Sequence, residues 1–214
     1  MSSNEIWQCL IVEVLKGKSH LKFLRTLKYL LLGRPDRQVL VLVRLMLLAK
    51  IKGWNRLSRY FQDRLARQYG IYIGNSVTIG PGLKLPHPTG IVLGKGVVIG
   101  KNCTIYQQVT IGLAAHDHRH GHYAQIGDEA VFYAGVKIIG AVKIGHYVTV
   151  GANAVVNRSI ESHSIACGVP ARVVRSFRAE TPGAKADAQY KLMPYQHLKS
   201  SSDLEDPLNI KRVG

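Results

Sequence analysis

An apolar residue recurs every six positions through the middle of this chain, and no other feature limits the possible folds so strongly. With the phase reset after Ile91 and after Ile111, every position of the series is Ile, Leu, Val or Phe. Such residues fill roughly a quarter to a third of an ordinary chain, so chance does not produce the pattern. A helix repeats about every 3.6 residues and an alternating strand about every two, so neither explains it. The series is 73, 79, 85, 91, then 93, 99, 105, 111, then 126, 132, 138, 144, 150 and 156.

Short strands that bend at every sixth residue do explain the period, because each face of a three-sided coil then receives one inward residue. Small or β-branched residues repeat four positions later, as at Val77 and Cys103, and Gly follows many of the aliphatic residues, as in Ile79-Gly80. We expect these glycines at corners with positive φ. The sequence therefore predicts a parallel β-helix over residues 71–175, with about eighteen residues per coil and about five or six coils.

The two flanks lack the repeat. Residues 1–70 show helical spacing at Ile6, Leu10 and Val14 and again at Leu21, Leu24, Leu27 and Leu31, with a break at Gly33-Arg34-Pro35-Asp36. This segment holds 14 Lys and Arg against 4 acidic residues, and we predict an α-helical oligomerisation or membrane-surface region. Residues 176–214 are aperiodic and rich in Pro, Ser, Lys and Asp, which predicts an arm or tail.

Composition excludes several classes of protein. The net charge is +16, yet apolar residues make up 46% of the chain, so it is able to bury a core. No uncharged run approaches the ~20 residues that span a bilayer, and we expect no signal peptide. Three widely spaced cysteines fit neither a disulfide framework nor a zinc motif, so we expect a reducing cytoplasm. Charge alone suggests nucleic-acid binding, but no recognised binding motif accompanies it.

The repeat fails twice. Eight residues instead of six separate Leu85 from Leu93. Residues 113–125 are thirteen residues where four would complete the hexad, an excess of nine. The second excess must leave the coil as a loop, and it contains His116, His118, His120 and His122. Breaks in a strict repeat are where function tends to lie.

Three segments together resemble hexapeptide-repeat acyltransferases, most closely the serine acetyltransferase-like branch. They are His87-Pro88-Thr89-Gly90-Ile91-Val92, the loop before Ile126-Gly127-Asp128, and Ala166-Cys167-Gly168-Val169-Pro170-Ala171-Arg172. The resemblance implies a left-handed parallel β-helix, a homotrimer or a dimer of trimers, and an active site between neighbouring subunits. It also implies acetyl-CoA as the donor, a hydroxyl as the acceptor and no metal.

His87 matches the catalytic His of that family. A hydroxyl is a poor nucleophile until its proton is being removed, and an imidazole with pKa ~6.5 is largely basic near neutral pH. The alternative is a loop His held by backbone hydrogen bonds. The family adds a second His from the loop of the adjoining subunit, for which we expect His122, with His120 as the next candidate; a solvated His-rich loop is the other interpretation.

For acetyl-CoA the resemblance implies a pantetheine channel along Ala134, Gly135 and Ala152. Arg158, Arg172 and Arg175 would approach the phosphates, although each can equally be a solvated surface charge. We expect Cys103 in the core, and Cys167 lacks a base within the repeat. Attack in a ternary complex is therefore favoured over an acyl-cysteine intermediate.

The choice of acceptor depends on which carboxylates the sequence places near His87. Serine acetyltransferases carry carboxylates at the positions of Tyr72 and Pro86, and an amino acid's ammonium normally binds a carboxylate. Their absence favours a sugar hydroxyl in capsular or exopolysaccharide synthesis, with serine O-acetylation in cysteine biosynthesis as the alternative. A metal hydratase that uses His116, His118, His120 and His122 is a further alternative.

Overall fold

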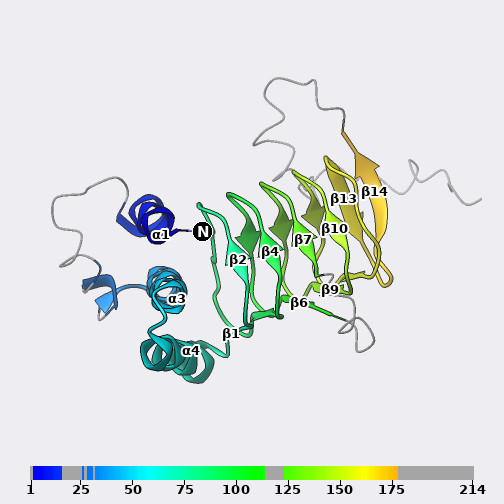
Figure 1. Cartoon of the computed structure of the whole chain (residues 1–214). Coiled ribbons are helices and arrows are strands. Elements are labelled where there is room, and N and C mark those ends of the chain that lie inside the picture. The colour runs from blue at the N-terminus through cyan, green and yellow to red at the C-terminus, as the bar shows by residue number, and fades with distance from the viewer. Residues whose placement is uncertain (1, 16–25, 27, 31, 114–122, 178–214) are drawn as a thin grey trace, which may run out of the picture. The chain divides into compact units, whose positions relative to one another are not determined.

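The structure is a computed structural model that describes residues 2–15, 26, 28–30, 32–113 and 123–177. These residues belong to one compact unit, in which a helical segment precedes a stack of parallel strands (Figure 1). The expectations for Leu21, Leu24, Leu27 and Leu31, for the His-rich part of the loop and for the C-terminal tail lie outside the described residues. No described helix is long and apolar enough to cross a membrane.

The N-terminal segment contains α1 (Ser3–Leu10), a π-helical turn η1 (Ile11–Leu15), α3 (Pro35–Ile51) and α4 (Asn55–Tyr69). Ser2 and Glu5 form a capping box at the start of α1, and Pro35 occupies the first turn of α3. Gly70 ends α4 in the left-handed conformation. Helix α3 lies between α1 and α4 (Figure 1), and residues all round it are buried.

Three sheets form the walls of the coil. The first contains β1 (Tyr72–Ile73), β3 (Val92–Leu93), β6 (Thr110–Gly112), β9 (Lys137–Ile139) and β12 (Val155–Val156). The second contains β2 (Thr78–Ile79), β4 (Val98–Ile99), β7 (Gln125–Ile126) and β10 (Lys143–Ile144). The third contains β5 (Thr104–Ile105), β8 (Val131–Phe132), β11 (Thr149–Val150), β13 (Ser164–Cys167) and an antiparallel last strand, β14 (Arg172–Ser176).

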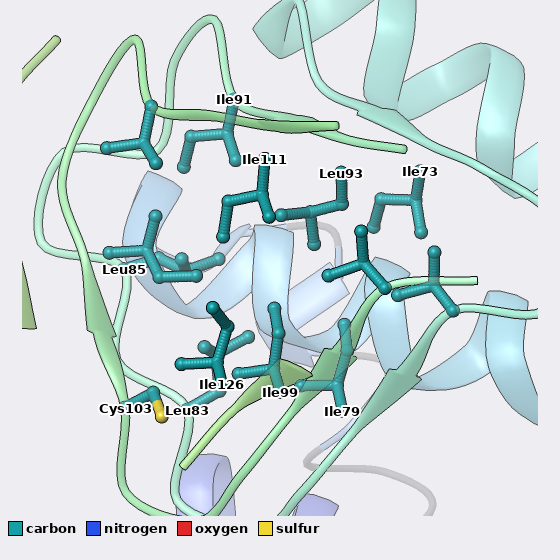
Figure 2. Close-up of a cluster of buried hydrophobic side chains, with 14 of the residues drawn as sticks. Ile73, Ile79, Leu83, Leu85, Ile91, Leu93, Ile99, Cys103, Ile111 and Ile126 are labelled. Atoms are coloured by element: carbon teal, nitrogen blue, oxygen red, sulfur yellow. The ribbon is translucent and has the colours of Figure 1, made fainter. Parts of the chain in front are cut away.

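The register confirms the predicted coil and both breaks in it. Val92 pairs with Thr110, eighteen residues on. The offset is 20 residues between Thr78 and Val98, which span the first break, and 27 between Val98 and Gln125, which span the second. Every position of the hexad series is buried, and Figure 2 shows such side chains from successive coils pointing toward one another. The fold is a left-handed β-helix with an N-terminal helical segment.

The glycines of the repeat have a different role from the one predicted. A Cβ on Gly80 would lie 2.7 Å from the carbonyl carbon of Gly100, and one on Gly127 would lie 2.7 Å from that of Gly145. These positions therefore need glycine because the next coil approaches closely. Positive φ falls two residues later, at residues such as Asn102.

The first break also shifts the core register. Thr89 comes four residues after Leu85, in the small-residue series of Val77 and Cys103, yet it is exposed. Ile91 is buried and takes the place of that series in this coil. The backbone N–H of Val92 donates to Val109, which places Ile91 beside Val109 in the next coil. The two surplus residues therefore lie between Leu85 and Thr89, where they enlarge one turn.

A buried ion pair joins the helices to the first coil. Arg44 of α3 donates to both carboxylate oxygens of Glu13 and to the carbonyls of Ile79 and Gly80, at 2.7 and 2.6 Å. Glu13 also accepts from the Leu83 N–H at 3.0 Å. The exposed fractions of the two ionic side chains are 0% and 1%, so the pair is shielded from water.

Candidate active site

His87 lies on the enlarged turn, where the third sheet passes to the first. Its side chain is exposed, and its ring centroid is 6.1 Å from that of Tyr106 in the next coil. Tyr106 stacks in turn on Tyr133, at 5.2 Å. Within the described residues the His87 imidazole makes no hydrogen bond to another side chain. Its ring is therefore open to solvent at this corner.

Residues of successive coils form a column beside His87. The Gln108 N–H donates to Thr89 at 2.9 Å, the Gly135 N–H to Gln107 at 3.0 Å, and the Asn153 N–H to Ala134 at 2.9 Å. These bonds align Thr89, Gln107, Ala134 and Ala152. We call residues 86–90, 106–108, 133–135 and 151–153 the His87 corner. The structure therefore brings His87 together with Ala134, Gly135 and Ala152, for which the family resemblance implies a pantetheine channel.

Gln107 is a residue of this corner that the sequence argument missed. Its side-chain Oε1 is buried and has no hydrogen-bond partner, although a buried polar atom without a partner costs roughly 1–3 kcal/mol. Its place between Thr89 and Ala134 puts the amide between the base motif and the small-residue channel. Counting along the corrected register from Thr89 identifies it, but the hexad pattern alone does not.

The three candidate phosphate-binding arginines are all exposed. Arg158 lies away from this corner, whereas Arg172 pairs with Cys167, whose sulfur packs against Gly151 of the corner. Arg158 follows β12, at the corner where the first sheet passes to the second. Arg172 and Arg175 are on β14, and the Arg175 guanidinium lies 5.0 Å from the centre of the Phe177 ring. The described residues therefore leave their phosphate-binding role a prediction.

The His-rich loop leaves the coil between β6 and β7, at the same corner as Arg158. Its described base includes Tyr123, whose ring fills the space where Gly96 lacks a side chain. This corner and the His87 corner lie at opposite ends of the strands of the first sheet. His122, His120 and the other loop histidines lie outside the described residues.

Other reactive groups do not join the site. Cys103 is fully buried, and burial raises the pKa of its thiol to about 11. His146 accepts a hydrogen bond from the Asp128 N–H at 3.0 Å, and His163 stacks on Tyr147, both at the corner between the second and third sheets. Among the described residues, no group of three or more His, Cys, Asp or Glu is arranged to hold a metal ion.

The chain is similar in sequence to a family of transferases and to several serine acetyltransferases. Residues 123–158 match the family described as bacterial transferase hexapeptide (six repeats). The serine acetyltransferase of Staphylococcus aureus (strain N315) is 37% identical over 121 residues, which cover 56% of this chain and 53% of the relative. That of Haemophilus influenzae is 33% identical over 133 residues, covering 60% and 49%. The chain thus spans about half the length of the curated relatives it matches.

The chain is also similar to solved structures of serine acetyltransferases. A serine acetyltransferase in complex with CoA superposes with a TM-score of 0.63 at 26% identity, covering 81% of this chain and 70% of the other. The Vibrio cholerae enzyme gives 0.62 at 26% identity, covering 84% and 67%.

These relatives overturn the expectation of a sugar acceptor, because they are serine acetyltransferases. The lack of carboxylates at Tyr72 and Pro86 does not exclude serine as the acceptor, since a carboxylate can come from another element of the fold. The chain is a left-handed β-helix of hexapeptide repeats, similar to the serine acetyltransferases of the hexapeptide-repeat acyltransferase family.

Proposed function

We propose that this protein is an acetyl-CoA-dependent serine O-acetyltransferase. The observation that carries the proposal is an exposed His87 on the enlarged turn after Leu85, beside the column that contains Ala134 and Ala152. The similarity to serine acetyltransferases supplies the acceptor, and the relative solved with CoA supports the donor.

His87 acts as the general base. Its neutral imidazole takes the proton from the serine hydroxyl as that oxygen bonds to the acetyl carbonyl carbon, and it returns a proton to the departing thiolate sulfur. The acetyl group moves from sulfur to oxygen, so the products are O-acetylserine and free CoA. No covalent enzyme intermediate is needed, which agrees with a buried, weakly acidic Cys103.

The His87 corner fits the narrow arm of CoA. Ala134 and Ala152 offer small side chains and backbone groups along the column, and Gly135 is buried with a φ of +75°. That φ lies in the left-handed region, which strains a residue with a Cβ, and a Cβ there would also displace the Asn153 side chain, whose Oδ1 would lie 2.0 Å away. Arg158, Arg172 or Arg175 would then neutralise the phosphates, with the first reaching the site from another corner or another subunit.

We also propose a homotrimer. His87 and the base of the His-rich loop lie at different corners of one subunit, so a two-histidine site needs the loop of a second copy. A three-fold ring that places the loop corner of one subunit against the His87 corner of the next supplies it. A dimer of trimers through the N-terminal helices is compatible with this arrangement.

Release of CoA from acetyl-CoA, followed with serine and with sugar acceptors, tests the proposal. We expect saturable turnover that depends on serine. Absence of serine-dependent release, with turnover of another acceptor, would assign the fold to a different acetyl transfer.

We propose a cytoplasmic location, at the inner face of the membrane. The described cysteines are all free, as expected in a reducing compartment.

Trp54, Leu57 and Tyr60 form an exposed stripe at the start of α4. Lys52, Arg56 and Arg59 flank it, and residues 51–62 contain no acid. Apolar and aromatic residues with basic neighbours favour an anionic lipid surface, whereas a two-fold contact of this face with itself would oppose like charges.

Trp7→Phe makes Trp54 the single tryptophan, because the chain has two. We expect its emission to shift to shorter wavelength on vesicles of phosphatidylcholine with phosphatidylglycerol, less so with added salt, and not on phosphatidylcholine alone. An unchanged spectrum, or a Leu57→Ser variant that lowers the oligomer mass without vesicles, would exclude this role. Val98→Ser on β4 is a control, since Val98 is 41% exposed and Leu57 40%.

A further inference from the structure

A cleft of about 430 Å³ separates the N-terminal helices from the free edge of the first coil. Asp36 and Arg37, from the first turn of α3, line one side, and Lys84 and Pro86 line the other. Pro86 directly precedes His87, so the cleft ends next to the proposed base. Its volume exceeds that of a small amino acid.

Two carboxylates line this cleft, and only one is available to a ligand. Glu13 is buried and already binds Arg44 and the Leu83 N–H. Asp36 is 36% exposed, and its ion-pair partner Arg34 is 86% exposed, 3.6 Å away. An ion pair as exposed as Arg34–Asp36 is weak. The Asp36 carboxylate can therefore leave Arg34 and accept hydrogen bonds from the ammonium group of a ligand.

Tyr29 fixes the orientation of the Arg37 side chain. One terminal nitrogen of its guanidinium donates to the Tyr29 hydroxyl at 2.9 Å, and its Cζ lies 5.2 Å from the centre of the Tyr29 ring. A guanidinium has five N–H donors, so this arrangement orients the group while leaving donors for a bidentate carboxylate. A negative and a positive side chain are thus adjacent in the sequence and line one cleft.

We infer that the cleft binds the amino-acid end of the acceptor. Asp36 receives the ammonium and Arg37 the carboxylate, so that the hydroxyl of a serine-like molecule points toward His87. Asp36 then supplies from α3 the carboxylate that is missing at Tyr72 and Pro86. The inference rests on the proposed function, because it requires an acceptor that carries both charges.

Truncated acceptors test each contact separately. Ethanolamine lacks the carboxylate of serine, and 3-hydroxypropionate lacks its ammonium. We expect Asp36→Asn to lower kcat/KM about 10- to 100-fold for serine and ethanolamine and to leave 3-hydroxypropionate unchanged. We expect Arg37→Gln to lower it similarly for serine and 3-hydroxypropionate and to spare ethanolamine.

Three controls separate binding from folding. Asp63→Asn removes an exposed carboxylate from α4 and should leave all three acceptors unchanged. Tyr29→Phe removes the hydroxyl that orients Arg37 and should reproduce a smaller form of the Arg37→Gln pattern. KM for acetyl-CoA should stay constant throughout.

The results show separately whether the cleft binds the acceptor and whether the protein acetylates serine. If the wild-type protein acetylates serine and Asp36→Asn changes nothing, or lowers all three acceptors equally, the cleft assignment is wrong and the function stands. If the wild-type protein does not acetylate serine, both are wrong.

Discussion

Replacing Glu13 with Leu would leave the most deeply buried cation of the described residues without its counter-charge. Arg44 is 0% exposed and has four hydrogen bonds, two of which go to Glu13. Removing one member of a buried ion pair typically costs about 3–5 kcal/mol, because the remaining charge stays desolvated. Domains are stable by only about 5–15 kcal/mol, so we expect a large loss in the free energy of unfolding.

Arg44→Met should cost a similar amount, since it leaves the Glu13 carboxylate buried and removes the donors of the Ile79 and Gly80 carbonyls. The double variant Glu13→Leu/Arg44→Met buries no charge and should be more stable than either single variant. Urea unfolding followed by circular dichroism measures all three. Single-variant losses below about 1 kcal/mol, the usual size of an exposed pair, or strictly additive losses would refute the reasoning.

Three further predictions concern other residues. The raised pKa of Cys103, from 9.0 to about 11, means that the unfolded chain loses this proton first as the pH rises. Unfolding free energy should fall by about 2–3 kcal/mol between roughly pH 9 and 11, and Cys103→Ala should flatten that slope. Because Cys9 and Cys103 are buried, a thiol reagent should modify Cys167 quickly in the native protein and all three cysteines after denaturation. Gln107→Leu should not lower the melting temperature, because its buried Oε1 has no hydrogen-bond partner to lose.

Much of the fold follows from the sequence because the β-helix repeats one local constraint. The hexad series predicted the inward residues, the coil length and both breaks, since each inward position meets the same environment one coil later. The positive φ predicted for glycines such as Gly80 was wrong, because the repeat pattern does not show how closely the next coil approaches. The inward position expected for Thr89 was wrong, because the place of the two surplus residues within the break depends on the pairing of the next strand with Val109.

The site was only partly predictable for a related reason. His87, Ala134 and Ala152 could be grouped because the family resemblance implies a role for each of them. Gln107 and the Asp36–Arg37 pair could not, because they depend on alignment between coils and on contact of α3 with residues far away in the sequence. Arg158 lies at the other corner of its own subunit, so the phosphate-binding role that the resemblance implies for it stays a prediction.

The most direct test of the catalytic claim is the rate of CoA release with serine for wild type, His87→Ala and the control His146→Ala. His146 is an exposed corner histidine that bonds to Asp128 rather than lying at the His87 corner. We expect His87→Ala to lose at least ~100-fold in kcat, the lower range for removing a general base, with unchanged circular dichroism, and His146→Ala to stay near wild type. A His87→Ala variant that keeps wild-type turnover would contradict the mechanism.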